Sequence, residues 1–434
     1  MKKIRPITDL RKTNTLSDDA HSMQEPIFIT KNGYSDLVVM SHELYETMCE
    51  KGMQSFKKIS EDWPPLKDTS KENMGFVKVA CATIDVQVAN PIYNSERVIE
   101  KVKECALKKV HLLVFPELCM SGYTCQDLFL QDSLLKGVEK GIQHILEETK
   151  EIPMVFMIGA PVLVDDKCYN CAVVMLKGKI LGIVPKTYLP NYNEFYEVRH
   201  FYRAPSINQY ITYLDQYVPF GNRLLFRNSA YKNWIMGIEI CEDLWVPNPP
   251  STYHALGGAT ILCNLSASNE IVGKKEYREM LVNATSARLV AGYLYCSSGN
   301  GESTTDLVFS GANIIAENGS ILKKATLFKN ETIISEIDVE KMVLERQKMT
   351  SYEASNREGY TLVTFDLPLD KVELTRFFSP TPFIPHDEKE RYERVKSILK
   401  LQVMGLLKRV EHTHASTLVI GLSGGLDSTL ALLV

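Results

Sequence analysis

The 434-residue sequence lacks several features that mark specialised classes of protein. No apolar run approaches the roughly 20 residues that a membrane-spanning helix needs, and the basic N-terminus has no apolar segment typical of a signal peptide. We therefore expect no membrane association and a cytoplasmic location. A formal net charge of -4 gives the chain no overall electrostatic attraction for nucleic acid.

Ordered cysteine motifs are also missing. The ten cysteines have no regular spacing, and the single CxxC pair, Cys168 and Cys171, has no second pair to complete a zinc site. Because this pair lies in a strand-like apolar run, we interpret both residues as reduced, packed thiols. What is present is ordinary for a globular protein: 45% hydrophobic and 24% charged residues, in a chain long enough for two or three domains.

Changes of pattern along the chain predict five segments. Residues 1–53 form a small α+β unit, and residues 54–73 are a polar junction with a Pro-Pro pair. Residues 74–349 form the main domain. Residues 350–385, with prolines gathered near their end, are an extended connector, and residues 386–434 begin a further domain.

Strands alternate with helices through the main domain. Helices are predicted at residues 91–109, 130–149 and 276–290. Because many strand pairings look antiparallel, we expect layers of helix around two sheets rather than one doubly wound sheet. The predicted strands lie within residues 75–84, 111–118, 153–164, 168–184 (two strands), 234–240, 259–268 and 292–300, with a last hairpin that turns at 317–320.

The stretch WIMGIEICEDLW, residues 234–245, combines a buried strand with a nucleophile. Its apolar, β-branched run predicts a strand that ends at Cys241, directly before Glu242 and Asp243. A thiol at the end of a rigid strand is accessible from a cleft and is held in place for nucleophilic attack. A buried core cysteine is the simpler alternative for this residue taken alone.

Two further stretches place an ionisable side chain at the end of an apolar run. Glu117 follows residues 112–116, where a partly desolvated carboxylate suits a general base. Lys186 closes the stretch GKILGIVP, where an ammonium group suits the stabilisation of an oxyanion. Each residue alone is equally compatible with a surface charge, but Glu, Lys and Cys in the same setting together predict an active site.

The stretches VFPELCMSGY, GKILGIVPKTYLPNYNEF and IEICEDLW resemble the nitrilase superfamily, whose catalytic set is Glu-Lys-Cys. They are most similar to its glutaminase branch, which is fused to NAD synthetase, and GESTTDLVFSGANIIAENG is similar to the same branch. The resemblance runs from about residue 75 to the end. It implies a four-layer αββα sandwich, with a small α+β appendage before it and a truncated α/β adenine-nucleotide hydrolase-like piece after it.

The resemblance also implies roles for individual residues. Cys241 would be the nucleophile, Glu117 the general base and Lys186 the stabiliser of the tetrahedral intermediate, with Glu194 supporting the site. The implied reaction hydrolyses L-glutamine through a thioester and needs no metal. The residues that match glutamine-holding positions are Tyr192, Glu242, Ser268 and Lys274. Lys274 departs from the common arginine, and a lysine does not fork onto a carboxylate.

A second candidate site lies near the end of the chain, between a predicted short strand at 416–421 and the start of another helix. A glycine pair before a helix N-terminus lets backbone N–H groups close on a phosphate, although the Walker A pattern is absent. The segment resembles the pyrophosphate loop of N-type ATP pyrophosphatases, and a plain glycine-rich turn is the alternative. Its residues are Ser423, Gly424, Gly425, Leu426, Asp427, Ser428 and Thr429.

Taken together, the resemblances imply a glutamine-hydrolysing NAD+ synthase. Ammonia from glutamine would amidate deamido-NAD+ at the expense of ATP and Mg²⁺, in a homo-oligomer. A synthetase domain needs on the order of 200 residues, and fewer than fifty follow residue 385. We therefore expect the sequence to be a fragment in which only the glutaminase half is complete.

Residues 1–50 resemble the Phd/YefM-type antitoxins, through KIRPITDLR and EPIFITKNGYSDLVVMSHELYE. The pattern predicts a hairpin with an Asn-Gly turn at 32–33, followed by a helix that begins near His42. The family forms dimers that bind operator DNA, and a C-terminal tail wraps a toxin; here another sequence replaces the tail after Met53. An in-frame fusion without function is the alternative, and Met74 is a candidate start codon.

Two other functions remain open at this point. A nitrilase-type amidase that acts on a different amide would use the same catalytic set. Alternatively, residues 1–50 are a module that binds DNA or a toxin and the rest of the chain is a passenger, which is the one case in which nucleic acid is expected as a partner.

Overall fold

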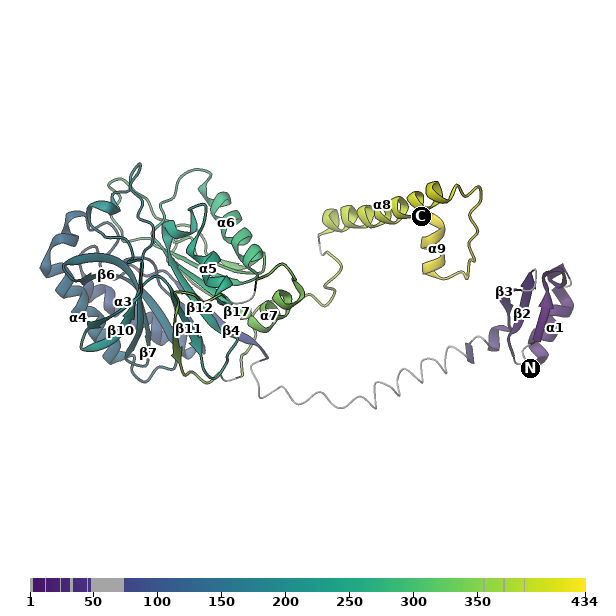
Figure 1. The fold of residues 1–434 in the computed structure, drawn as a ribbon, viewed down its shortest axis with the longest axis horizontal. Coiled ribbons are helices and arrows are strands. Elements are labelled where there is room, and N and C mark those ends of the chain that lie inside the picture. Colours follow the sequence, from purple (N-terminus) through teal and green to yellow (C-terminus); the bar gives the residue numbers. More distant parts are fainter. Residues whose placement is uncertain are drawn as a thin grey trace. The chain divides into compact units, whose positions relative to one another are not determined.

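The computed structural model describes residues 3–11, 13–23, 25–31, 34–44, 46–47, 74–353, 356–369, 371–385 and 387–434. The chain divides into two compact units, Met1–Glu72 and Asn73–Val434, which are described separately below (Figure 1). The predicted junction at residues 54–73 lies outside the described residues.

The described residues of the N-terminal unit form a three-stranded sheet and short helical segments. β2 and β3 pair antiparallel, which confirms the predicted hairpin, while β1 pairs in parallel with β2 and was not predicted. Residues 42–44 and 46–47 are helical, and the predicted turn at 32–33 lies outside the described residues. The elements are β1 (Lys3–Pro6), the 3-10 helix η1 (Ile7–Arg11), α1 (Thr13–Met23), β2 (Ile27–Lys31) and β3 (Tyr34–Val39).

The larger unit is built on two mixed sheets. The first has eight strands in the order β17-β4-β5-β6-β7-β8-β10-β9. Its neighbours β4, β5 and β6 are parallel, whereas β6, β7 and β8 form an antiparallel meander. The strands are β4 (Phe76–Ala82), β5 (Leu112–Val114), β6 (Val155–Val164), β7 (Lys167–Leu176), β8 (Lys179–Pro185), β9 (Gln209–Tyr213), β10 (Gln216–Phe220) and β17 (Thr332–Asp338).

The second sheet has seven strands in the order β16-β15-β14-β13-β12-β11-β18. Its central strands β12, β13 and β14 are parallel. The strands are β11 (Leu224–Asn228), β12 (Ile235–Ile240), β13 (Ile261–Ser266), β14 (Gly292–Ser297), β15 (Ile314–Glu317), β16 (Ser320–Lys324) and β18 (Thr361–Phe365).

Helices cover the outer faces of both sheets, so the unit has four layers (Figure 1). Because alternate residues of a strand point to opposite faces, each sheet contributes to two cores. The central core joins Val79 and Val114 of the first sheet to Ile238 and Cys263 of the second. The helices are α3 (Pro91–Leu107) and α4 (Asp132–Glu148) over the first sheet, α5 (Pro250–Leu256) and α6 (Lys274–Leu289) over the second, and α7 (Val339–Lys348) after β17.

This architecture confirms the predicted αββα sandwich, including helices at α3, α4 and α6. Part of the expected connector at 350–385 is different, because it contains β18, which extends the second sheet in parallel with β11. The sequence TLVTF is β-branched and apolar, and Phe365 is buried against Trp234. The prolines that suggested a connector all lie after this strand.

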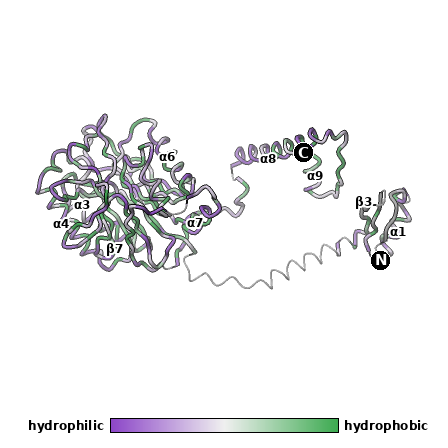
Figure 2. The backbone as a smooth tube through the Cα atoms, viewed as in Figure 1, coloured by the Kyte–Doolittle hydropathy of each residue, from purple (hydrophilic) through white to green (hydrophobic). Residues whose placement is uncertain are grey.

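The last part of the chain contains two helices, α8 (Glu388–Thr413) and α9 (Leu426–Leu433). Neither helix buries a residue, and the colouring along α8 alternates between hydrophobic and hydrophilic residues (Figure 2). The short strand predicted at 416–421 is wrong: these residues are not a strand, and none of the described strands pairs with them. None of the described helices is long and apolar enough to cross a bilayer.

Candidate active site

Glu117, Lys186 and Cys241 are located at the ends of three strands from both sheets. Lys186 directly follows β8, Cys241 directly follows β12, and Glu117 lies just past β5. Cys241 belongs to the core between the two sheets, and the side chains of Glu117 and Lys186 are fully buried. The predicted trio is therefore assembled by strands that are far apart in the sequence.

Glu117 holds three hydrogen bonds. Its Oε1 accepts from Nζ of Lys186 and from Nδ2 of Asn170, both at 2.6 Å. Its Oε2 accepts from the backbone N–H of Ala267 at 2.7 Å. Three donors satisfy the buried carboxyl group and fix its orientation, as the geometry of a general base requires.

The segment that carries Glu117 packs directly on Gly159 of β6. A Cβ atom at position 159 would lie 2.1 Å from the backbone nitrogen of Leu118 and 2.5 Å from the carbonyl oxygen of Pro116. The backbone N–H of Met120 also donates to the carbonyl oxygen of Gly159 at 3.1 Å. Glycine at this position therefore lets β6 hold Glu117 in place.

Lys186 lies between two carboxylates. Its Nζ is 2.6 Å from Oε1 of Glu117 and 2.6 Å from Oε1 of Glu197. Burial alone would lower the pKa of Lys186, but the two carboxylates outweigh it and the pKa rises well above its usual value. Burial raises the pKa of Glu197 to about 7. Glu197 shares the ammonium of Lys186 with Glu117, and the effect of burial on Glu197 prevails. Glu197 is therefore protonated below about pH 7.

Cys241 begins the 3-10 helix η5 (Cys241–Leu244) with a left-handed backbone, φ 43°. Its backbone N–H donates to Oδ1 of Asn264 at 3.2 Å. Burial and the nearby charge of Glu117 raise the pKa of the thiol, and Lys186 opposes them. The thiol is therefore protonated at rest, and nucleophilic attack requires a base beside it.

Asp243 ties the turn of Cys241 to the segment after Lys186. Its Oδ2 accepts from the backbone N–H of Ile240 at 3.0 Å, and its Oδ1 accepts from that of Tyr188 at 2.8 Å. Burial raises the pKa of Asp243 to about 8. This carboxyl group fixes the approach of two strand ends from different sheets.

The residues expected to hold the substrate form two contacts at the edge of the site. The hydroxyl of Tyr192 donates to Glu242 at 3.0 Å. Lys274 Nζ donates to Oδ1 of Asn269 at 2.6 Å and lies 5.1 Å from the ring centre of Trp245. Ser268 is buried two residues past the end of β13 and directly before Asn269.

Glu194, which was expected to support the site, accepts a hydrogen bond from Asn269. Glu197, three residues later, occupies the place beside Lys186. Sequence reasoning missed Glu197 because it lies in the polar run NEFYEVRH with no apolar strand before it. It also missed Asn170 and Asn264, which lie within predicted strands, and Asn269, which directly follows one.

Residues 78–347 match the family described as carbon-nitrogen hydrolase. The chain belongs to the carbon-nitrogen hydrolase family. The "Glutamine-dependent NAD(+) synthetase" of Mycobacterium tuberculosis is 38% identical to it over 370 residues, which are 83% of this chain and 54% of that protein. The chain thus spans about half the length of the curated relatives it matches.

Two solved structures are similar to this carbon-nitrogen hydrolase. A glutamine-dependent NAD(+) synthetase from Cytophaga hutchinsonii is 27% identical, with a TM-score of 0.54 over 60% of this chain and 43% of that one. A glutamine-dependent NAD+ synthetase from Acinetobacter baumannii in complex with ADP is 27% identical, with a TM-score of 0.51 over 62% of this chain and 46% of that one.

The segment 423–429 of this carbon-nitrogen hydrolase forms the start of α9. Gly424 has φ 80°, and Gly425 is the N-cap of the helix. The hydroxyl groups of Ser428 and Thr429 donate to the carbonyl oxygen of Gly425 at 3.1 and 2.9 Å. The backbone N–H groups of the first turn lie at the helix N-terminus, where a phosphate is favoured.

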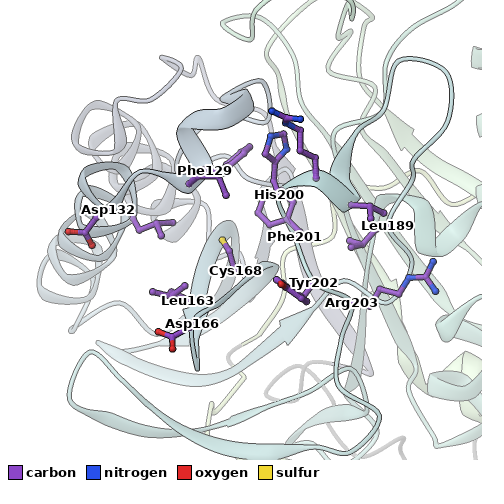
Figure 3. A pocket seen from close by; sticks show the side chains of 14 residues that line it. Phe129, Asp132, Leu163, Asp166, Cys168, Leu189, His200, Phe201, Tyr202 and Arg203 are labelled. Carbon is purple, nitrogen blue, oxygen red and sulfur yellow. The ribbon is translucent and has the colours of Figure 1, made fainter.

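A cavity of about 900 Å³ lies on another part of the domain, and Glu117, Lys186 and Cys241 do not line it (Figure 3). Cys168 points into it, between Phe129 and Leu163. Burial raises the pKa of Cys168 to about 12 and no neighbouring charge contributes, whereas the charges of Glu117 and Lys186 both act on the thiol of Cys241. The chemistry of the domain is therefore assigned to the strand ends rather than to its large cavity.

Proposed function

We propose that this chain hydrolyses L-glutamine as the glutaminase part of a glutamine-dependent NAD+ synthetase. The observation that carries the proposal is the contact of Glu117 with Lys186 in a buried site whose charges act on the thiol of Cys241. The 38% identity to the mycobacterial synthetase supports glutamine as the substrate.

The first half of the reaction forms a thioester. Glu117 takes the thiol proton while the sulfur of Cys241 bonds to the carboxamide carbon of glutamine, and the carbonyl electrons move to its oxygen. An N–H of Lys186 that faces neither carboxylate, with the backbone N–H of Glu242, stabilises this oxyanion. The oxyanion collapses, the C–N bond breaks, and Glu117 returns the proton to the leaving group so that ammonia departs.

The second half releases glutamate. Glu117, ionised again, takes a proton from a water molecule as that water attacks the thioester carbon. The tetrahedral intermediate forms against the same donors and collapses with cleavage of the C–S bond. The proton returns to the sulfur of Cys241, and the protonated thiol of the resting site is restored.

Four residues are proposed to hold the amino acid end of glutamine: Tyr192, Glu242, Ser268 and Lys274. Glu242 offers a negative charge to the α-ammonium group, and Lys274 a positive charge to the α-carboxylate. Burial lowers the pKa of Lys274 and raises that of Glu242, because both side chains have lost contact with water. The charged groups of the bound substrate would take the place of that water. A single ammonium cannot grip a carboxylate in the bidentate way of an arginine.

The test is ammonia release from L-glutamine by the wild type and by C241A. We expect loss of at least about 1,000-fold in C241A, because the nucleophile is removed. C105A is the matched control, since Cys105 is equally buried in α3. Equal rates in the wild type and C241A would overturn the proposal, and activity on other amides with refusal of glutamine would favour the alternative amidase.

In the complete enzyme the ammonia would amidate deamido-NAD+ with ATP and Mg²⁺. Residues 423–429 are proposed to hold the pyrophosphate of ATP; Gly424 and the helix N-terminus fit that group. The described residues contain no group of three or more metal-ligating side chains, and no Mg²⁺ ligand is proposed.

The N-terminal unit is proposed to be a separate antitoxin-like module. It has its own small core of Leu16, Ala20, Ile27 and Ile29. Deletion of residues 1–53 should leave glutamine hydrolysis unchanged, and a gel shift with palindromic operator DNA tests nucleic-acid binding. A cytoplasmic homo-oligomer remains our prediction for the whole protein, to be checked by light scattering after gel filtration.

A further inference from the structure

Asn170 contacts both charged residues of the proposed catalytic pair. It lies in β7 next to the end of β8 and is fully buried. Its Nδ2 donates to Oε1 of Glu117 at 2.6 Å, and its carbonyl oxygen accepts from the backbone N–H of Lys186 at 2.8 Å. One residue therefore fixes the side chain of the base and the backbone position of the ammonium.

The two oxygens of Glu117 have different surroundings. Oε1 is occupied by two side-chain donors, Lys186 and Asn170. Oε2 accepts only the backbone N–H of Ala267 among the described residues, at 2.7 Å. Oε2 is thus the carboxylate oxygen that no described side chain occupies, and the charge of Glu117 acts directly on the thiol of Cys241. Of the two oxygens, Oε2 is therefore the one left to accept a proton.

We infer that Asn170 is a positioning residue that occupies Oε1 of Glu117 and thereby directs Oε2 to take the proton of Cys241. The inference rests on the proposed function for its catalytic meaning. With Asn170 in place, rotation of the carboxylate would break two hydrogen bonds from side chains. Without it, Lys186 alone holds Oε1, and the carboxylate turns away from the sulfur more easily.

The energetics of the amide agree with this role. Oδ1 of Asn170 is buried and has no hydrogen-bond partner among the described residues. An unpaired buried acceptor destabilises a fold, and an apolar side chain at position 170 would avoid that cost. The presence of an amide therefore agrees with a role for its N–H group at Glu117. Only a neutral donor of this length satisfies Oε1 without adding a charge, since a carboxylate there would repel Glu117 and an ammonium would compete with Lys186.

Alkylation of Cys241 by iodoacetamide, followed by mass spectrometry, tests the inference without glutamine. At pH 7 we expect N170A to be alkylated about 10- to 100-fold more slowly than the wild type, the effect of one lost hydrogen bond to a charged group. The difference should shrink as the pH rises, because hydroxide then replaces the base. In glutamine hydrolysis kcat should fall by a similar factor while KM stays within about twofold.

N228A is the matched control, because Asn228 is also fully buried and hydrogen-bonded but lies at the end of β11. It should alkylate and hydrolyse at wild-type rates. If N170A fails to fold, N170D provides a side chain of the same shape. Its added carboxyl group should shift the pH range in which the alkylation rate rises to higher pH. Wild-type alkylation in both N170A and N170D, or equal loss in N228A, would overturn the inference.

The outcomes also separate this inference from the proposed function. If the wild type does not hydrolyse glutamine and Cys241 alkylation still depends on Asn170, the glutaminase proposal fails and the positioning role stands. If glutamine is hydrolysed and neither alkylation nor kcat depends on Asn170, the glutaminase proposal stands and the positioning role fails.

Discussion

Lys186 and Glu197 form an ion pair that is closed to solvent, with Nζ 2.6 Å from Oε1. The side chain of the lysine is 0% exposed and that of the glutamate 4%. The hydroxyl of Tyr123 adds a hydrogen bond to the same oxygen at 2.8 Å. Because Glu117 shares the same ammonium, the protonation of Glu197 controls how much of the positive charge is available to the rest of the site.

The first prediction concerns pH. Burial raises the pKa of Glu197 from 4.5 to about 7 in the folded protein. A group with a raised folded pKa contributes stability that is complete below pH 4.5 and is lost as the pH rises through about 7. Between these values the unfolding free energy of the wild type should fall by up to about 3 kcal/mol relative to E197Q. Urea denaturation at several pH values measures this difference. The exposed E96Q should follow the wild type, and parallel curves for E197Q and the wild type would contradict the prediction.

The second prediction is that K186M destabilises the fold by about 3 to 5 kcal/mol, because two buried carboxylates lose their common partner. K186M/E197Q should recover part of the loss, since one uncompensated charge is removed with the lysine. Urea denaturation of the single and double variants gives the coupling. K179M, at the exposed start of the same strand, is the control. Additive effects in the double variant would show that the pair does not interact.

The third prediction concerns substrate affinity. Lys274 is held by Asn269 at 2.6 Å and lies over Trp245. K274A and N269A should raise KM for glutamine about tenfold or more while kcat changes little, because the group acts on the substrate's carboxylate and not on the reacting bond. Initial-rate kinetics measure both constants. K275A, the exposed neighbour on α6, should match the wild type, and a loss confined to kcat would argue against this role.

The fourth prediction is that G159A lowers kcat and stability together. Its methyl group would overlap the backbone on either side of Glu117, so that segment must shift. We expect at least about a tenfold loss of kcat, measured by ammonia release, and a loss of about 1 to 3 kcal/mol in urea denaturation. G405A is the control, because nothing lies near a Cβ at that position in α8. Wild-type kinetics in G159A would mean that the backbone of Glu117 has room to move.

The fifth prediction concerns the edge of the domain. A protein that ends at residue 385 keeps β18 and the ion pair of Arg376 with the buried Glu317, and it should remain as stable as the full chain. A protein that ends at residue 349 exposes the core around Trp234 and should melt at a lower temperature. F365A within the full chain should cost about 3 to 5 kcal/mol, because Phe365 packs against Trp234 with ring centres 5.3 Å apart. Equal melting temperatures for the two truncated proteins would refute the contribution of β18.

The strands of the site could be predicted because each is a short apolar run that ends in a polar residue. Glu117, Lys186 and Cys241 all have this local pattern, and family resemblance joined them. Local pattern could not find Glu197, because it lies eleven residues after its partner Lys186 and the segment between them has no regular periodicity. Nor could it find Asn170, whose role depends on the pairing of β7 with β8.

The same limit explains the errors in the fold. β18 pairs with β11 over a separation of more than 130 residues, and nothing local distinguishes an edge strand from a connector. Conversely, residues 416–421 have the composition of a buried strand, but a strand forms only where a neighbour accepts its hydrogen bonds. The composition of a segment shows whether it can form a strand, and the presence of a neighbouring strand decides whether it does.

β17 pairs with β4 along its whole length, and β4 is the first strand of the large unit. Its partner is therefore synthesised about 250 residues after it, which at ribosomal speed is a delay of roughly 13 to 50 seconds. Throughout that interval one edge of β4 has no strand in the nascent chain with which to pair. Translation thus sets the earliest time at which the first sheet can be completed. A chaperone that binds exposed strands could bind β4 during this interval.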